Sequence, residues 1–207
     1  MTGSQAPTAE RPAAQWPRVA LRIGFGCVWM IDAVFKWLPG FRSTYADIVA
    51  AGSQGQPGWL HPWFTFWVDW QRPNLTFFTY LVAVIETMIA LGLLLGFARK
   101  LTYVLALVFS LLVWGVAEGF GGPYASGSTD IGGAIMYAVL FAALLGFDYC
   151  QGPDPLAVDS YLEQRISWWH WIAETGHHHR YAHSHSGGTA AQRPTVSAPP
   201  APRSGLV

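Results

Sequence analysis

Charged side chains inside or at the ends of long apolar stretches are the groups in this chain best suited to chemistry. Asp32 and Lys36 end the first such stretch, and Glu86 lies within the second. Glu118 closes the third. A charge at the centre of a bilayer costs roughly 2.5 to 3.5 kcal/mol even on mild insertion scales, so such groups persist only where they face protein or water. They therefore predict a polar site between membrane helices.

Proton transfer is the chemistry that these groups suggest. Asp130 begins the fourth apolar stretch and adds another acid. The carboxylates would repel one another if all were ionised in a medium of low dielectric constant, so at least one is expected to hold a proton near neutral pH. We predict that the reacting groups are Lys36, Glu86, Glu118 and Asp130. The alternative is structural: an Asp32–Lys36 ion pair, with a protonated Glu86 donating a hydrogen bond between helices.

Aromatic side chains near these charges are expected to wall a pocket. Arg22, Trp29 and Lys36 follow one another at seven-residue intervals, which places them on one narrow face of a helix that turns about 100° per residue. Trp114 lies four residues before Glu118 on the third stretch. The residues predicted to bind a cofactor are Arg22, Trp29, Trp114, Tyr124 and Tyr137.

The elements that must position these groups are helices. Only 12% of the 207 residues are charged, against about 25% in soluble domains, and 52% are hydrophobic. Helices satisfy all their backbone groups within lipid. Apolar runs near the roughly 20 residues that span a bilayer are found at 19–38, 76–98, 101–120 and 130–149. The predicted fold is an all-α, polytopic membrane four-helix bundle, in which Gly92 and Gly96 form a small-residue packing pair.

Two further helices are expected at the membrane surfaces. The segment 41–75 is too polar to cross, yet its tryptophans, Trp59, Trp63, Trp67 and Trp70, recur at helical spacing. We interpret it as a short helix in the outer interface; a lid over the bundle is the functional alternative. The stretch 154–172 is amphipathic and predicts a helix on the cytoplasmic surface.

The distribution of positive charge predicts the orientation. Arg and Lys flank the start of the first run, fill the connection at Arg99 and Lys100, and recur in the tail. The positive-inside rule then places both termini in the cytoplasm, with the chain crossing the membrane several times. The expected location is the plasma membrane of a bacterium or archaeon. The expected domains are a disordered segment 1–17, a four-helix domain 18–150, an amphipathic segment 151–175 and a disordered His- and Pro-rich tail 176–207.

Other classes of site receive little support. The formal net charge is zero, which gives no reason to expect a nucleic-acid partner. Cys27 and Cys150 have no CxxC or metal-ligand spacing, and no bound metal or flavin is expected. The histidines between His177 and His185 are interpreted as a weak metal binder or a pH-sensitive tail, and a true metal-handling site remains the alternative.

Several segments resemble the DoxX/DoxD family of membrane proteins. "LRIGFGCVWMIDAVFKW" resembles the first span of that family, and "VIETMIALGLLLGFARKL" resembles the second. "GFGGPYASGSTDIGGAIMYAV" looks like the third connection and fourth span of the DoxD branch, and "PLAVDSYLEQRISWW" like the segment that follows. The resemblance covers residues 16–172. The polar residues that match by position are Arg22, Lys36, Glu86, Arg99, Glu118 and Asp130.

The resemblance implies electron delivery to quinone. DoxD is the membrane subunit of a thiosulfate:quinone oxidoreductase, and other members belong to complexes with soluble redox partners. We therefore expect a membrane subunit of a quinone-linked oxidoreductase that uses thiosulfate or a similar sulfur oxyanion at the outer face, with quinone as electron acceptor. Its expected partners are the lipid bilayer, a second subunit or soluble redox protein, and further copies of itself. The alternatives are a non-catalytic scaffold for soluble redox enzymes and a small transporter or metal-handling protein.

Overall fold

The computed structural model describes residues 16–124, 130–151, 154 and 156–173. These residues form helices and connecting turns, with no strand among them. Three helical stretches in this part of the chain are long and apolar enough to cross a membrane: Gly58–Leu95, Arg99–Val116 and Gly133–Cys150. The prediction of an all-helical membrane protein is therefore confirmed at this level.

Four long helices stand out among the described residues. They are α1 (Trp16–Trp37), α4 (Leu75–Leu95), α5 (Arg99–Val116) and α6 (Gly133–Gln151). Each lies close to one of the predicted apolar runs. α1 begins at Trp16, inside the segment expected to be disordered; the rest of that segment and the tail 176–207 lie outside the described residues. α1 is the most highly charged of the four, which is why it is not among the three apolar stretches.

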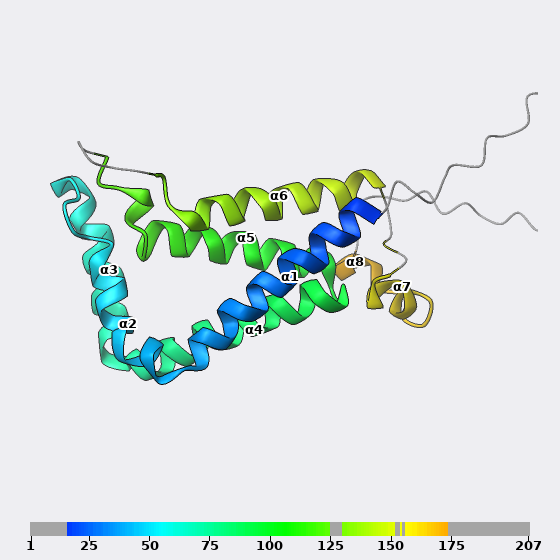
Figure 1. The fold of residues 1–207 in the computed structure, drawn as a ribbon, viewed down its shortest axis with the longest axis horizontal. Helices are drawn as coiled ribbons and strands as arrows, with labels where there is room; N and C mark the ends of the chain where they lie inside the picture. The colour runs from blue at the N-terminus through cyan, green and yellow to red at the C-terminus, as the bar shows by residue number, and fades with distance from the viewer. Residues whose placement is uncertain (1–15, 125–129, 152–153, 155, 174–207) are drawn as a thin grey trace, which may run out of the picture. The chain divides into compact units, whose positions relative to one another are not determined.

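The long helices associate in two pairs. α1 packs along α4, and α5 packs along α6, as Figure 1 shows. Gly26 allows the first approach, because a Cβ there would lie 3.0 Å from the Cβ of Leu93. Gly92 allows α4 to approach α5, since its Cβ would lie 2.6 Å from Thr102 Oγ1. Gly96, the predicted packing partner of Gly92, lies just beyond the end of α4 instead. It adopts the left-handed conformation that ends this helix, with φ at 63°.

A buried aromatic cluster joins the two pairs at mid-length. Phe25 and Trp29 of α1 contact Phe141 of α6, with ring centroids 5.0 and 5.4 Å apart. Leu93 of α4 and Leu144 of α6 are fully buried in the same cluster. Rings at such distances and tilts contribute packing free energy beyond their buried area.

Residues 39–74, which we call the arch, cross one end of the long helices. The prediction of one short helix here is corrected: the arch contains α2 (Pro39–Ala51), η2 (Gly58–Leu60), α3 (His61–Gln71) and η3 (Arg72–Asn74). Pro39 occupies the start of α2, where its missing N–H costs nothing.

The far end of the arch is fixed to the end of α5. A Cβ at Gly52 would overlap the carbonyl oxygen of Val116, so only glycine permits this contact. Gln56 Nε2 donates to Gly119 O at 2.7 Å, and Trp63 Nε1 donates to Gly115 O at 2.9 Å. The arch thus extends from the α1–α4 pair to the α5–α6 pair (Figure 1).

The C-terminal segment packs at the opposite end of the long helices. It contains two short helices, α7 (Val158–Glu163) and α8 (His170–Ala173), in place of the single amphipathic helix expected. Two apolar residues of this amphipathic stretch, Leu156 and Tyr161, are each 56% exposed, whereas Trp169 packs against Phe97 with ring centroids 5.2 Å apart. Asp154 and Asp159 are almost fully buried instead. Buried polar contacts therefore hold this segment in place together with apolar ones, such as that of Trp169 with Phe97.

Candidate functional site: a cavity between the helix pairs and the arch

A cavity of about 480 Å³ lies between the two helix pairs and the arch. Its size falls within the roughly 300 to 1,000 Å³ of small-molecule sites. Most of its wall is apolar or aromatic, and every long helix contributes to it. Its charged and polar members outside the aromatic rings are Asp32, Lys36, Gln71, Glu86, Ser110 and Glu118. A wall of this kind suits an amphipathic ligand of moderate size.

One ion cluster lies in the cavity wall. Lys36 Nζ is 3.0 Å from Asp32 Oδ1 and 3.6 Å from Glu86 Oε2. Asp32 and Lys36 are four residues apart on α1, the spacing that brings helical side chains together. Glu86 comes from α4 and is 4% exposed. The predicted Asp32–Lys36 pair is therefore present, and Glu86 joins it.

Four buried polar atoms around the cavity have no hydrogen-bond partner among the described residues. They are Trp29 Nε1, Trp67 Nε1, Ser110 Oγ and Glu86 Oε2. All four parent residues line the cavity. An unsatisfied buried polar group costs about 1 to 3 kcal/mol, so such groups are rare without a bound partner. The four residues bring two indole N–H donors, a hydroxyl and a carboxylate to the wall of the cavity.

The arch adds a hydrogen-bonded pair to the wall. The hydroxyl of Tyr45, on α2, donates to Gln71 Oε1, on α3. Burial raises the pKa of Tyr45 from 10.0 to about 12. The phenol therefore stays protonated, and its hydrogen bond joins the two helices of the arch.

Glu118 lines the cavity but serves a second purpose. Its carboxylate accepts hydrogen bonds from Ala134 N at 3.0 and 3.2 Å, at the start of α6. A carboxylate at a helix N-terminus satisfies free N–H groups and interacts favourably with the helix dipole. Trp114 lies nearby but outside the cavity, where its Nε1 donates to Ile131 O at 2.7 Å.

The structure brings five of the nine predicted site residues to the cavity: Trp29, Lys36, Glu86, Glu118 and Tyr137. The others are elsewhere. Asp130 is exposed, and its Oδ1 accepts from Gly132 N at 2.8 Å. Tyr124 is 67% exposed, with its hydroxyl donating to Phe120 O. With Trp114, these two residues shape the connection between α5 and α6.

Arg22 lies at the other end of α1, away from the cavity. It is 1% exposed and forms an ion pair with Asp154, Nε to Oδ2, at 3.2 Å. Its Nη1 also donates to the carbonyl oxygens of Leu93 and Leu94 at the end of α4. Its partners are those of a structural residue that joins α1, α4 and the C-terminal segment.

A second buried arginine binds the same segment. Arg99 Nη1 is 2.8 Å from Asp148 Oδ1, and Arg99 Nε is 3.1 Å from Asp159 Oδ2. Asp159 also accepts from the backbone N–H groups of Ala98 and Arg99, at 2.7 and 2.9 Å, and so caps α5 from a distant part of the chain. We call the contacts of Arg22 and Arg99 with these acids the ionic clasp.

Sequence reasoning missed several of these residues. The tryptophan spacing indicates only an interfacial helix for Trp67, and the sequence gives no signal for Tyr45 or Gln71. Asp148 carried a usable signal, because it is an acid near the end of the fourth apolar run, where a buried cation is needed to stabilise it. Asp159 carried none, since it lies in a polar stretch and only the fold brings it to Arg99.

No group of three or more metal-binding side chains occurs in the described portion of the chain. The histidines from His177 to His185 lie outside that portion. Comparison with protein-family models, curated proteins and solved structures gives no match to this chain. The resemblance to the DoxX/DoxD family therefore stays a prediction, and the cavity itself is the basis for a functional proposal.

Proposed function

We propose that this protein is the membrane subunit of a quinone-linked oxidoreductase and that its cavity binds the quinone. In this proposal α1, α4, α5 and α6 all cross the bilayer as a four-helix bundle. The observation that carries it is the set of unpaired buried polar atoms in an aromatic, apolar cavity of about 480 Å³. The membrane is that of a bacterium or archaeon, with both termini in the cytoplasm.

The wall of the cavity suits the two chemical faces of a quinone. Its flat apolar ring matches the aromatic side chains, among them Trp29, Trp67 and Tyr137. Its carbonyl oxygens are acceptors, and Trp29 Nε1, Trp67 Nε1 and Ser110 Oγ are donors without protein partners among the described residues. A bound quinone would serve as the acceptor of electrons from the donor subunit.

Glu86 is the residue best placed to hold a proton for this reaction. Glu86 lines the cavity, and its buried Oε2 lies 3.6 Å from Lys36 Nζ. A carboxyl group that can exchange a proton beside a cation is a suitable general acid or base. Lys36 and Asp32 then act as positioning residues, because their contacts determine the charge around Glu86.

The charge of the cluster bears on the electron donor. Two acids, Asp32 and Glu86, accompany one lysine, so Lys36 offers little net attraction to an anion. Thiosulfate or a similar sulfur oxyanion is proposed as the donor from the family resemblance alone. Because the cluster holds more carboxyl groups than ammonium groups, we propose that the oxyanion is oxidised on a partner subunit and does not bind within this cavity.

A small transporter is the second candidate, for a reason found in the same cluster. An aromatic cavity whose ion cluster holds two carboxyl groups and one ammonium group also suits an organic cation, through cation–π contacts and, when Glu86 is ionised, one unbalanced negative charge. Proton-driven flux of such a cation in liposomes, without quinone binding, would support this candidate over the first.

The decisive experiment is quinone binding by the detergent-purified full chain. We expect wild-type protein to bind a short-chain para-benzoquinone, and to carry endogenous quinone when extracted gently. Glu86→Gln should still bind it but should lose about 100-fold or more in quinone reduction by the intact complex, the usual scale of one general acid. Wild-type protein that binds no quinone would reject the proposal and favour a scaffold or a transporter.

A further inference from the structure

We infer that Trp67 of the arch, together with Trp29, makes the cavity prefer the oxidised form of its ligand over the reduced form. This inference rests on the proposed function, because it concerns recognition of the quinone in the same cavity. It gives the arch a role in ligand choice, beyond interfacial anchoring or a lid.

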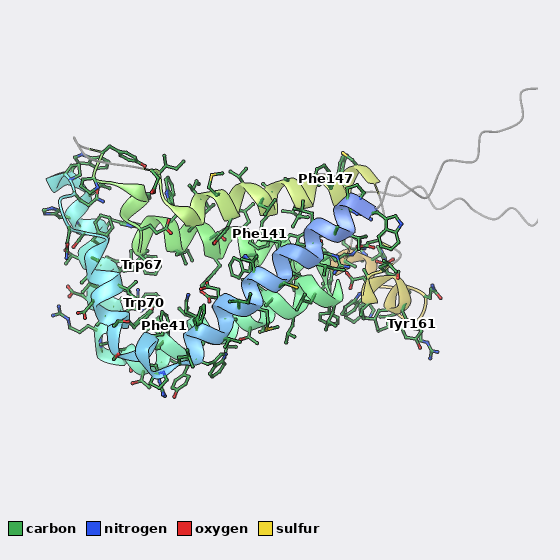
Figure 2. The ribbon with its side chains drawn as sticks, viewed as in Figure 1. Phe41, Trp67, Trp70, Phe141, Phe147 and Tyr161 are labelled. Carbon is green, nitrogen blue, oxygen red and sulfur yellow. The ribbon has the colours of Figure 1, made fainter. Side chains whose placement is uncertain are left out.

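Trp67 lines the cavity and is packed among aromatic neighbours of the arch. Its ring packs against Trp63 and Trp70, with centroids 5.6 and 5.4 Å apart and interplanar angles of 67° and 66°. Figure 2 shows Trp67 and Trp70 on α3, with Phe41 on α2. The Nε1 atom is buried and has no hydrogen-bond partner among the described residues.

The arch cannot easily turn this ring away. Trp63, one helical turn before Trp67, donates its own N–H to Gly115 O on α5 at 2.9 Å. Gln56 Nε2 holds Gly119 O at 2.7 Å at the same end. Because these bonds tie the arch to α5 and to Gly119 beyond it, the backbone that carries Trp67 is held in place beside the cavity.

The chemistry of an indole N–H gives the direction of the preference. It donates and never accepts. The oxidised ligand carries carbonyl oxygens, which are good acceptors, whereas the reduced ligand carries hydroxyl groups, which are weaker acceptors and new donors. Trp29 and Trp67 therefore favour the oxidised form, and the carboxylates of Asp32 and Glu86 are the groups that can receive the donors of the reduced form.

Trp67→Phe tests this inference, since it keeps an aromatic ring and removes the N–H. Equilibrium binding is measured on the folded, detergent-purified full chain with a short-chain para-benzoquinone and with its hydroquinone under anaerobic conditions. We expect affinity for the oxidised probe to fall about five- to ten-fold, the effect of one buried hydrogen bond, and affinity for the reduced probe to change less than about two-fold. Trp29→Phe should behave alike.

Trp59→Phe is the matched control, because Trp59 also belongs to the arch but is 78% exposed and outside the cavity wall. It should leave both affinities unchanged. Equal losses for both probes in Trp67→Phe, or no loss, would overturn the inference while wild-type binding preserves the proposed function. Absence of wild-type binding to either probe would reject both.

Discussion

At the scale of single residues, the protein places its charges in two separate groups with different surroundings. Asp32, Lys36 and Glu86 border a cavity and leave one carboxylate oxygen without a hydrogen bond among the described residues. Asp148 and Asp159 are buried against Arg99, and Asp159 also accepts from Ala98 N. The first arrangement borders a cavity, whereas the second joins the helix ends to the C-terminal segment.

Asp159→Ala should be among the most destabilising substitutions in the chain. It removes the acceptor for two backbone N–H groups, for Arg99 Nε and for Trp169 Nε1 at 2.9 Å. Breaking a buried ion pair by removing one partner costs about 3 to 5 kcal/mol. Thermal unfolding in detergent measures the loss, and Asp47→Ala, at an exposed position of α2, is the control. Equal melting temperatures for the two variants would contradict a structural role for the clasp.

Tyr45 predicts a loss of stability in alkali. Its pKa is raised from 10.0 to about 12 in the folded protein, so folding favours the protonated phenol. The stability that this contributes is complete below the unfolded pKa and is lost as pH rises from about 10 to 12. We expect wild type to lose about 1 to 3 kcal/mol more than Tyr45→Phe across this window. If wild type and Tyr45→Phe lose the same free energy of unfolding between about pH 10 and 12, Tyr45 is not the cause.

At the scale of elements, the arch joins the two helix pairs through contacts that need a specific backbone. Periodic tryptophans at 59, 63, 67 and 70 correctly predicted helix in this region. They could not predict that α2 and α3 form a two-helix unit. The contact between Gly52 and Gly119, which joins this unit to the end of α5, exists only once the ends of α2 and α5 have met in the fold. Long apolar runs, by contrast, determine a membrane helix locally, and the four predicted ranges were therefore close.

Gly52→Ala should detach the arch from α5. The added methyl group would overlap Val116 O, and this backbone atom cannot move without displacing the end of α5. We expect a cost of about 1 to 3 kcal/mol, as for other overpacked sites, and weaker ligand binding because the wall of the cavity shifts.

Gly58→Ala is the control for this substitution, since it lies in the same arch with no atom within 4 Å of the added Cβ. It should leave both stability and binding unchanged. If the two alanine variants bind quinone equally well, the contact at Gly52 does not shape the cavity.

At the scale of the whole molecule, the long helices are held together differently at their two ends. The ionic clasp gathers α1, α4, α5, α6 and the C-terminal segment at one end. The arch closes the other end around the cavity. Sequence patterns predicted the helices and the polar cluster on α1 and α4, but not the clasp, because its acids lie far along the chain from their arginines.

Orientation is a property of the whole molecule and is tested by labelling. Cys27 and Cys150 are exposed and must first be replaced by serine. In that background, a cysteine at position 53, in the arch, should react with an impermeant thiol reagent added outside intact cells, and one at position 197 should react only after lysis. The reverse pattern would place the cavity end of the molecule toward the cytoplasm.

The unpaired atoms of the cavity wall also make stability depend on mass action. A ligand that binds only the folded protein stabilises it by RT ln(1 + [L]/Kd), which is about 2.7 kcal/mol at one hundred times Kd. Washing with detergent that removes a lipid-soluble ligand would therefore lower the free energy of unfolding. Trp29, Trp67, Ser110 and Glu86 bear that loss directly, because their buried atoms then have only water to bind. The amount of this ligand that stays bound through purification would thus determine how stable the protein is in detergent.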